Sequence, residues 1–239
     1  MGYIPIFLEV GGKPCIVVGG GEVAQRKVRA LLEARATVTV VSPALSAELA
    51  AMARRGTIRH LARSYQRGDL RGFVLAYAAT DDGAVSRQLA VEADELGIPI
   101  NVADVPELCT FVAPSVIRQG DLQIAVSTSG ASPAMARRIR EELEPMFGAE
   151  YALALEILRA ARSWLQAAEP DPAARARKLS ALAASRRLLE CLRRGDYSSA
   201  DAALAEHLGP AMTLEALGLD LARSSPAPRR RAGDSRQEP

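Results

Sequence analysis

Hydrophobic and polar residues follow two different periods over the first hundred residues. Short runs rich in β-branched residues predict buried parallel strands at Cys15–Val18, Thr37–Val41, Phe73–Ala78 and Ile98–Val102, with a shorter candidate at Thr57–Leu61. Apolar residues at near-helical spacing predict helices over 22–34, 45–54 and 84–96. This alternation predicts an α/β fold with a parallel sheet that carries helices on both faces.

The pattern changes beyond residue 104. Leu122–Ser127 is predicted as another strand, and a helix is predicted to begin at Pro133, with Ser132 as its cap and Met135, Ile139, Leu143 and Met146 along one face. Residues 151–222 have a helical, alanine-rich pattern with breaks at 170–172 and 195. From residue 224 the chain is rich in Pro, Arg and Ser and is expected to be disordered.

The exit of the first predicted helix lacks the glycine that commonly ends a helix. If Arg35 takes the left-handed conformation there, the cost is roughly 1 kcal/mol relative to glycine. A helix end of another kind is the alternative.

The composition is that of an ordinary soluble globular protein, with 49% hydrophobic residues, 24% charged residues and a formal charge of +2. So small a charge gives no support to a nucleic-acid partner. The arginines at 229–231 fit a solvated tail better than a contact with an anionic partner. No apolar run reaches membrane-spanning length and the start lacks a basic signal segment, so no membrane contact and a cytoplasmic location are expected.

Cysteine and histidine are sparse. The three cysteines, Cys15, Cys109 and Cys191, are far apart and odd in number, which argues against a disulfide framework or a metal knuckle. Cys15 lies in a predicted buried strand and is interpreted as a small apolar filler. The two histidines, His60 and His207, have no partner at ligand spacing, so no metal site is expected.

Three consecutive glycines join the first strand to the first helix. Gly19, Gly21 and Ala24 match the dinucleotide pattern G-x-G-x-x-G/A. Gly19 is expected to make the tight turn, Gly21 to let a pyrophosphate approach, and Ala24 to let the helix pack on the strand. Strand, glycine turn and helix start together predict a Rossmann-like nucleotide-binding domain.

The end of the second strand departs from this pattern. An acidic residue normally binds the adenosine ribose about 20 residues past the glycines. Here Ser42 stands at that place, followed by Pro43, and its hydroxyl is expected to make a weaker contact. This position leaves the choice between NAD and NADP open.

In an open parallel sheet, ligands bind beyond the carboxyl ends of the strands. After the strand that ends at 78, Thr80 and Asp81 are candidates for contact with the nicotinamide ribose, while Asp82 is equally explained as a helix cap. After the strand that ends at 102, Asp104 is the candidate general base, and a turn-forming aspartate is the alternative.

Residues 127–133 form a second polar loop that leads into a helix start, a place that favours carboxylates or phosphates. The helix behind it carries Arg137, Arg138 and Arg140. These arginines are interpreted either as a solvated helix face or as contacts for an acidic substrate.

Six segments together resemble one known family. They are Ile4–Phe7, Val17–Ala24 with Arg26 and Lys27, Ala78–Asp82, Asn101–Asp104, Phe111–Ser115 and Val126–Pro133. In this order and spacing they resemble the precorrin-2 dehydrogenase and sirohydrochlorin ferrochelatase family, a module of sirohaem synthesis that occurs alone or ahead of a methyltransferase. The resemblance covers about residues 1–150 well and the remainder loosely.

The resemblance implies an NAD-dependent oxidation of precorrin-2 to sirohydrochlorin and, in some members, insertion of ferrous iron to give sirohaem. It implies Asp104 as the essential aspartate and cofactor contacts at Glu22, Val23, Pro43 and Ala44. Because these tetrapyrroles carry many carboxylates, substrate contacts are expected at Thr128, which stands in place of a loop serine, and at Ser129, Ser132, Arg137 and Arg138.

The family is also a homodimer, which interlocks through the segment at about 114–148 here. The implied organisation is an NAD-binding domain at 1–113, a dimerisation segment at 114–148, a helical domain at 149–222 and a disordered tail at 223–239.

Two other functions remain open. A regulatory module that senses NAD(H) without catalysis would share the glycine turn, but it would not need Asp104 or the second polar loop. A dehydrogenase for another small substrate fits the predicted fold but not the segments between 101 and 133.

Overall fold

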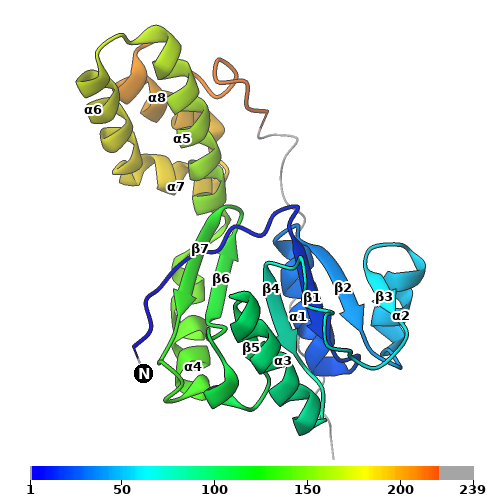
Figure 1. The fold of residues 1–239 in the computed structure, drawn as a ribbon. Helices are drawn as coiled ribbons and strands as arrows, with labels where there is room; N and C mark the ends of the chain where they lie inside the picture. Colours follow the sequence, from blue (N-terminus) through cyan, green and yellow to red (C-terminus); the bar gives the residue numbers. More distant parts are fainter. Residues whose placement is uncertain (1, 221–239) are drawn as a thin grey trace, which may run out of the picture. The chain divides into compact units, whose positions relative to one another are not determined.

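The computed structural model describes residues 2–220 (Figure 1). It divides into two compact units. The first contains the chain up to residue 114 together with 127–136, and the second contains 115–126 together with the chain from residue 137. The predicted tail at 223–239, with its arginines at 229–231, lies outside the described residues.

The first unit is built on a five-stranded parallel sheet, as predicted. Its strands are β1 (Pro14–Val18), β2 (Thr37–Val41), β3 (Arg59–Leu61), β4 (Leu75–Ala78) and β5 (Ile100–Val102). They lie in the order β3-β2-β1-β4-β5, and Val17 in the central strand pairs with Val40 on one side and Tyr77 on the other. Because β4 follows β3 in the chain but pairs with β1, the strand order reverses between β1 and β4.

Helices cover both faces of this sheet, because alternate residues of β1 point to opposite sides. Val17 packs with Val28 of α1 (Glu22–Glu33), in a cluster that also includes α2 (Ala47–Arg54). Ile16 packs in a second cluster with Leu89 of α3 (Gly83–Leu96). Figure 1 shows these helices beside the strands.

The start of α3 and the end of α1 both match expectations from the sequence. Asp82 caps α3 by accepting hydrogen bonds from the amides of Ala84 and Val85, which confirms the capping interpretation. Arg35, at the exit of α1, has a φ of 59°, so the left-handed conformation considered from the sequence is present.

Three predicted strands begin later than expected: β4 begins at Leu75 rather than Phe73, and β3 and β5 also begin two residues later than predicted. The amide of Ile98 donates to Ala93 O at 2.8 Å and the amide of Thr57 donates to Met52 O at 3.0 Å, so both residues close the preceding helix. These bonds take the amides away from the sheet, and β5 and β3 begin later than predicted.

A further strand was not predicted. β6 (Ser115–Gln119) pairs antiparallel with the expected β7 (Leu122–Val126), and Gly120 turns the chain between them with a φ of 56°. A two-residue Gly-Asp connection between strands is a hairpin signal that the sequence does contain.

The helix predicted to begin at Pro133 ends earlier than expected. α4 runs over Pro133–Leu143 and gives way to a short 3-10 turn at Glu144–Met146, because the residue before Pro145 disfavours the α conformation. Its predicted apolar face is largely uncovered: Met135 and Met146 are 47% and 59% exposed.

The predicted breaks at 170–172 and 195 are confirmed, but a break at 184–185 was not predicted, and the described residues after 208 are not helical, although the pattern predicts a helix there. Beyond α4, the second unit contains four helices. They are α5 (Ala149–Ala168), α6 (Pro172–Ala183), α7 (Arg186–Arg194) and α8 (Tyr197–Leu208), and they enclose a core that includes Ile157, Leu165, Leu188 and Leu204. Within residues 2–220, no helix combines the length and the apolar character needed to cross a bilayer.

Candidate functional site

Loops that follow β1, β2, β4 and β5 lie next to one another at one edge of the sheet. Backbone hydrogen bonds join them: Gly19 N to Val41 O at 2.9 Å, Ala79 N to Val18 O at 2.7 Å, and Ala103 N to Ala78 O at 2.9 Å. The structure therefore brings together the candidate residues that the sequence placed after these four strands.

The three glycines of the first loop have different surroundings. A Cβ atom at Gly19 would lie 2.0 Å from Ala79 O, and one at Gly20 would lie 1.9 Å from Ala44 O. Both glycines are therefore required by the packing of the protein itself. A Cβ at Gly21 would meet no protein atom within 4 Å, and its φ of −85° suits any residue.

Open space thus lies outside the chain at Gly21, where α1 begins. No side chain caps this helix start, so amides of the first turn have no side-chain acceptor. Amides at a helix start together with open space for an approaching group are what a pyrophosphate requires. The exposed Glu22 and the half-buried Val23 follow in the first turn. The residues present therefore fit a dinucleotide.

The loop after β2 is held in place by its own hydrogen bonds. The buried Ser42 donates from Oγ to Ala44 O at 2.7 Å, and His60 Nε2 donates to Ser42 O at 2.9 Å. Pro43 and Ala44 are exposed at the edge. The Ser42 hydroxyl proton is thus used within the loop, and a contact between Ser42 and a ribose stays a prediction.

The loop after β4 has two exposed aspartates, of which Asp82 is used as the cap of α3. Thr80 Oγ1 accepts a hydrogen bond from the amide of Asp82 at 3.3 Å, while the side chain of Asp81 is exposed. Thr80 therefore helps to shape the loop, and Asp81 is available to a ligand.

Asp104 lies in the turn directly after β5, is exposed, and has a left-handed φ of 61°. Aspartate tolerates this conformation better than most residues do. A turn-forming aspartate usually accepts a hydrogen bond from its own turn. Within the described residues the Asp104 carboxylate makes neither a hydrogen bond nor an ion pair, so it is free to act on a ligand.

Cys109 braces this turn from behind. The amide of Val102 donates to Cys109 Sγ at 3.2 Å, and Sγ donates to Val102 O at 3.3 Å and to Val105 O at 3.5 Å. These bonds span the turn that contains Asp104 and hold its strained backbone in one conformation. Nothing in the sequence spacing alone indicated this role for Cys109.

Lys27 of α1 is one of the residues that carry the family resemblance, but the sequence pattern indicated no role for it in the site. It is half-buried in the structure, and its Nζ lies 4.9 Å from the centroid of the Tyr77 ring. Burial lowers the pKa of the Lys27 amine, and Arg26 lowers it further, whereas Cys109 and Asp104 act in the opposite direction. The influence of Asp104 places Lys27 in the same electrostatic environment as the candidate base.

The second polar loop is closed by its own side chains. Thr128 Oγ1 donates to Ser132 O at 3.0 Å and accepts from Ser132 N at 3.1 Å. Ser132 Oγ accepts from the amide of Met135 at 3.1 Å, which confirms that Ser132 caps α4. Ser129 is exposed with a left-handed φ of 52°.

The arginines of α4 form ion pairs along the helix. Arg137 pairs with Glu141 at 2.9 Å and Arg138 pairs with Glu142 at 2.7 Å, and both arginines are more than 70% exposed. This arrangement is that of a solvated helix face, one of the two interpretations of these arginines. Their contact with a substrate stays a prediction.

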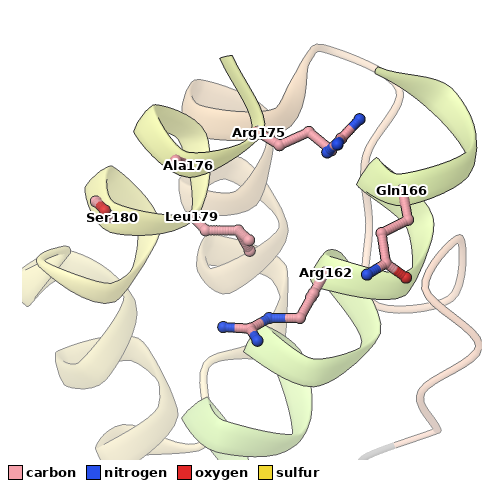
Figure 2. Close-up of a pocket in the computed structure, with 6 residues that line it drawn as sticks. All are labelled: Arg162, Gln166, Arg175, Ala176, Leu179 and Ser180. Atoms are coloured by element: carbon pink, nitrogen blue, oxygen red, sulfur yellow. The ribbon is translucent and has the colours of Figure 1, made fainter. Parts of the chain in front are cut away.

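Two shallow hollows lie within the second unit, between α5 and α6. One has a volume of about 360 Å³ and is lined by Arg162 and Gln166 of α5 and by Arg175 and Leu179 of α6 (Figure 2). Arg175 donates to Glu169 O at 2.7 Å, so its guanidinium is partly used by the helix connection. Residues 2–220 contain no group of three or more Asp, Glu, His or Cys side chains that could hold a metal ion.

Two family models match consecutive parts of the chain. Residues 6–115 match the family described as "Putative NAD(P)-binding", and residues 119–146 match "Sirohaem biosynthesis protein central". The first match covers the glycine turn and the Asp104 loop, and it confirms the expected class of cofactor. The second covers β7, the second polar loop and α4.

Curated relatives of this chain are named siroheme synthase. The siroheme synthase of Methylobacillus flagellatus is 48% identical over 151 residues, which are 63% of this chain and 32% of the relative. The siroheme synthase of Thioalkalivibrio sulfidiphilus is 44% identical over 177 residues, which are 74% of this chain and 36% of the relative. The chain therefore spans about a third of the length of these relatives.

A solved structure of SirC, precorrin-2 dehydrogenase, has the same fold. It superposes with a TM-score of 0.69 and 24% sequence identity, and the match covers 82% of this chain and 98% of that one. The predicted fold, a Rossmann-like sheet followed by a helical region, is thereby confirmed.

Proposed function

We propose that this chain, which matches a putative NAD(P)-binding family over residues 6–115 and a sirohaem biosynthesis family over residues 119–146, oxidises precorrin-2 to sirohydrochlorin with NAD as cofactor. The observation that carries the proposal is the free carboxylate of Asp104, which follows β5 at the edge where the glycine turn follows β1. A base and a dinucleotide site at one edge are the two parts that such an oxidation needs.

NAD, when bound, supplies the acceptor for the hydride that leaves the substrate. The residues that would hold it are Gly19, Gly21, Glu22 and Val23 at the start of α1, Ser42, Pro43 and Ala44 after β2, and Thr80 and Asp81 after β4. The open space at Gly21 and the uncapped start of α1 support this placement.

Asp104 is the base in this proposal. One of its carboxylate oxygens takes the proton that the substrate loses, so that the loss of one hydride and one proton leaves a new double bond. Within the described part of the chain, no hydrogen bond or ion pair of the Asp104 carboxylate has to break before it takes the proton. Cys109 fixes the turn that carries this carboxylate. A positioned general base contributes roughly 100- to 10,000-fold to a rate.

The substrate is an acidic macrocycle, and its carboxylates would be met by Thr128, Ser129, Ser132, Arg137 and Arg138. Exposed ion pairs such as those of Arg137 and Arg138 contribute little to stability, because water and salt screen the two charges. An incoming carboxylate can therefore replace a glutamate at small cost.

The protein acts as a homodimer in this proposal, through the segment 114–148, with 1–113 as the NAD-binding domain and 149–222 as a helical domain. Exposed apolar residues within this segment support a second copy: Met135 is 47% exposed and Met146 59%. Sedimentation of the full chain tests this, and a monomer at micromolar concentration would contradict it.

Insertion of ferrous iron into sirohydrochlorin is a second candidate activity. The free carboxylate of Asp104 supports it, because metal insertion requires a base that removes the pyrrole protons. Iron is the substrate in that reaction, so no resident metal site is needed. Anaerobic incubation with sirohydrochlorin and ferrous iron, against a control without protein, tests this activity.

The main experiment follows NADH absorbance while the protein oxidises precorrin-2. In the Asp104→Asn variant we expect turnover to fall at least about 100-fold, because asparagine tolerates the left-handed φ but cannot take the proton. The affinity for NADH, measured by fluorescence, should be unchanged.

A matched control is Glu107→Gln, which removes an exposed carboxylate from the same loop and should leave turnover intact. A folded wild-type protein that binds NADH but neither oxidises precorrin-2 nor changes the visible spectrum of a tetrapyrrole would favour the NAD(H)-sensing module instead. Loss of NADH binding in Asp104→Asn would move Asp104 into the cofactor site.

A further inference from the structure

Lys27 is a half-buried cation close to the proposed base. Its Nζ lies over the Tyr77 ring of β4, and the Tyr77 ring in turn meets the ring of Phe111 edge-on, with 5.5 Å between the ring centroids. Phe111 O accepts a hydrogen bond at 3.1 Å from the side chain of Asn101 in β5. These contacts place the Lys27 amine on the side of α1 that faces β4 and the loops after β5.

Lys27 forms no ion pair with any residue from 2 to 220, although a cation that loses water usually gains an anion. Arg29 of α1 pairs with Glu48, and Lys178 pairs with Glu169 at 2.9 Å. Arg26 and Lys13 also form no ion pair within residues 2–220, but both are exposed to water, whereas Lys27 is half-buried. The charged groups that act on Lys27 are Arg26, Asp104 and Cys109, and none of them contacts its Nζ.

We propose that Lys27 binds a carboxylate of the substrate and so fixes the macrocycle beside Asp104. This inference rests on the proposed function and adds a specificity residue to the same site. The anionic Asp104 by itself repels a substrate that carries many carboxylates, and a cation close by offsets this repulsion.

The position of Lys27 favours a substrate carboxylate over a phosphate of the cofactor. The amides that suit a pyrophosphate are at the start of α1, at Gly21, whereas Lys27 is in the second turn of the helix. The loop of Pro43 and Ala44, where the adenosine end of the cofactor is expected, follows β2 on the other side of β1. Lys27 instead contacts Tyr77 of β4 and interacts electrostatically with Asp104 in the loop after β5.

The test compares Lys27→Met, Lys27→Arg and Lys13→Met in the full chain. Methionine keeps an apolar stem against Tyr77 and removes the charge, arginine keeps the charge, and Lys13 is an exposed lysine before β1, at the opposite edge of the sheet. Sirohydrochlorin binding is measured by visible titration, KM and kcat for precorrin-2 by NADH formation, and NADH affinity by fluorescence.

We expect Lys27→Met to weaken sirohydrochlorin binding and raise KM by roughly 10- to 100-fold, the loss of one charge-assisted contact, with NADH affinity unchanged. Lys27→Arg should restore most of the affinity, and Lys13→Met should behave as wild type. Binding to the wild type should also weaken as alkaline pH removes the Lys27 charge, and this alkaline limb should be absent in Lys27→Met.

Three results would overturn the inference while the proposed function stands. The first is an unchanged KM and Kd in Lys27→Met. The second is a fall in kcat alone, which would mean that Lys27 supports the proton transfer to Asp104 and does not bind the substrate. The third is weaker NADH binding. If Lys27→Met does not fold, Lys27→Gln and the alkaline limb of the wild type decide the matter. A wild-type protein with no precorrin-2 oxidation would refute the proposed function itself.

Discussion

At the scale of single residues, three adjacent glycines serve two different purposes. Gly19 and Gly20 are glycine because the carbonyl oxygens of Ala79 and Ala44 occupy the space of a side chain. Gly21 has free space around it, so its lack of a side chain serves whatever approaches the start of α1. The motif pattern already gives Gly19 the tight turn and Gly21 the approach of a pyrophosphate. It leaves position 20 open, and only the structure shows that Gly20 is required as well.

This difference gives a paired prediction. Gly20→Ala should lower the free energy of unfolding by about 1–3 kcal/mol or more, because its Cβ overlaps a backbone oxygen. Gly21→Ala should cost no more than about 1 kcal/mol, the usual loss at a helix cap, but it should weaken NADH binding about tenfold or more. Urea unfolding and NADH fluorescence measure the two effects.

Gly83→Ala is a suitable control, since it lies in the first turn of α3 and its nearest neighbour, an arginine Nη1, is 3.6 Å away. It should leave both the unfolding energy and NADH binding almost unchanged. Equal losses of stability in the Gly20 and Gly21 variants would contradict the assignment of Gly21 to a ligand.

At the scale of elements, the connection between β3 and β4 is held by carboxylates. Asp69 accepts two hydrogen bonds of 2.7 Å from Arg63 and one of 2.9 Å from the amide of Gln66. The buried Glu92 of α3 accepts hydrogen bonds from the Tyr65 hydroxyl and from the amides of Gly68 and Leu70. The loop is therefore fixed to the sheet unit despite its lack of regular structure.

A pH dependence follows from Asp69. Arg63 holds the pKa of this carboxyl below its ordinary value of 3.8, and the amide of Gln66 acts in the same direction. The pair therefore stabilises the folded state above the ordinary pKa, and this stabilisation is lost as pH falls through the lower pKa of the folded state.

Asp69→Asn should lower the free energy of unfolding by roughly 1 kcal/mol at about pH 7, and the difference from wild type should shrink as the pH is lowered towards about 2. Urea unfolding at several pH values measures this. A difference that stays constant down to the most acidic pH would show that Asp69 acts without its charge.

Element positions were largely predictable because their signals are local. Runs such as Cys15–Val18 are buried on both faces, so they appear in the sequence as continuous apolar segments and are recognised as strands. The first residues of β3 and β5 were misassigned because the amides of Thr57 and Ile98 bond to the preceding helices. β6 was missed although the two-residue connection Gly120-Asp121 before β7 is a local hairpin signal.

At the scale of the whole molecule, each unit has a core of its own. The sheet unit encloses clusters around Val17 and Ile16, and the helical unit encloses one around Leu165 and Leu204. Chains with several cores commonly unfold in more than one step.

We therefore expect two thermal transitions in calorimetry of the full chain. NAD at about 100 times its Kd should stabilise the sheet unit by about 2.7 kcal/mol and raise one transition by several degrees. Leu204→Ala, which creates a cavity in the helical core, should lower the other transition. One transition that shifts as a whole in both experiments would contradict separate unfolding.

Some residues of the candidate site were recognisable from the local sequence, and others belong to the site only because the fold brings distant residues together. The glycine turn and Asp104 were recognisable because both follow strands whose apolar runs are visible in the sequence. Lys27 was not, because its place on α1 gives no sign of Tyr77 or Asp104 nearby, and Cys109 was not, because its bonds to Val102 and Val105 exist only in the folded turn.

The sequence by itself determined the strands, the glycine turn, the helix breaks and the candidate base, since side-chain period, glycine and proline act over a few residues. The tertiary structure decided that Gly20 must also be glycine, whether the Asp104 carboxylate is free, and which cation lies near it. These properties depend on which atoms meet across strands far apart in the chain, and the local pattern carries no record of them.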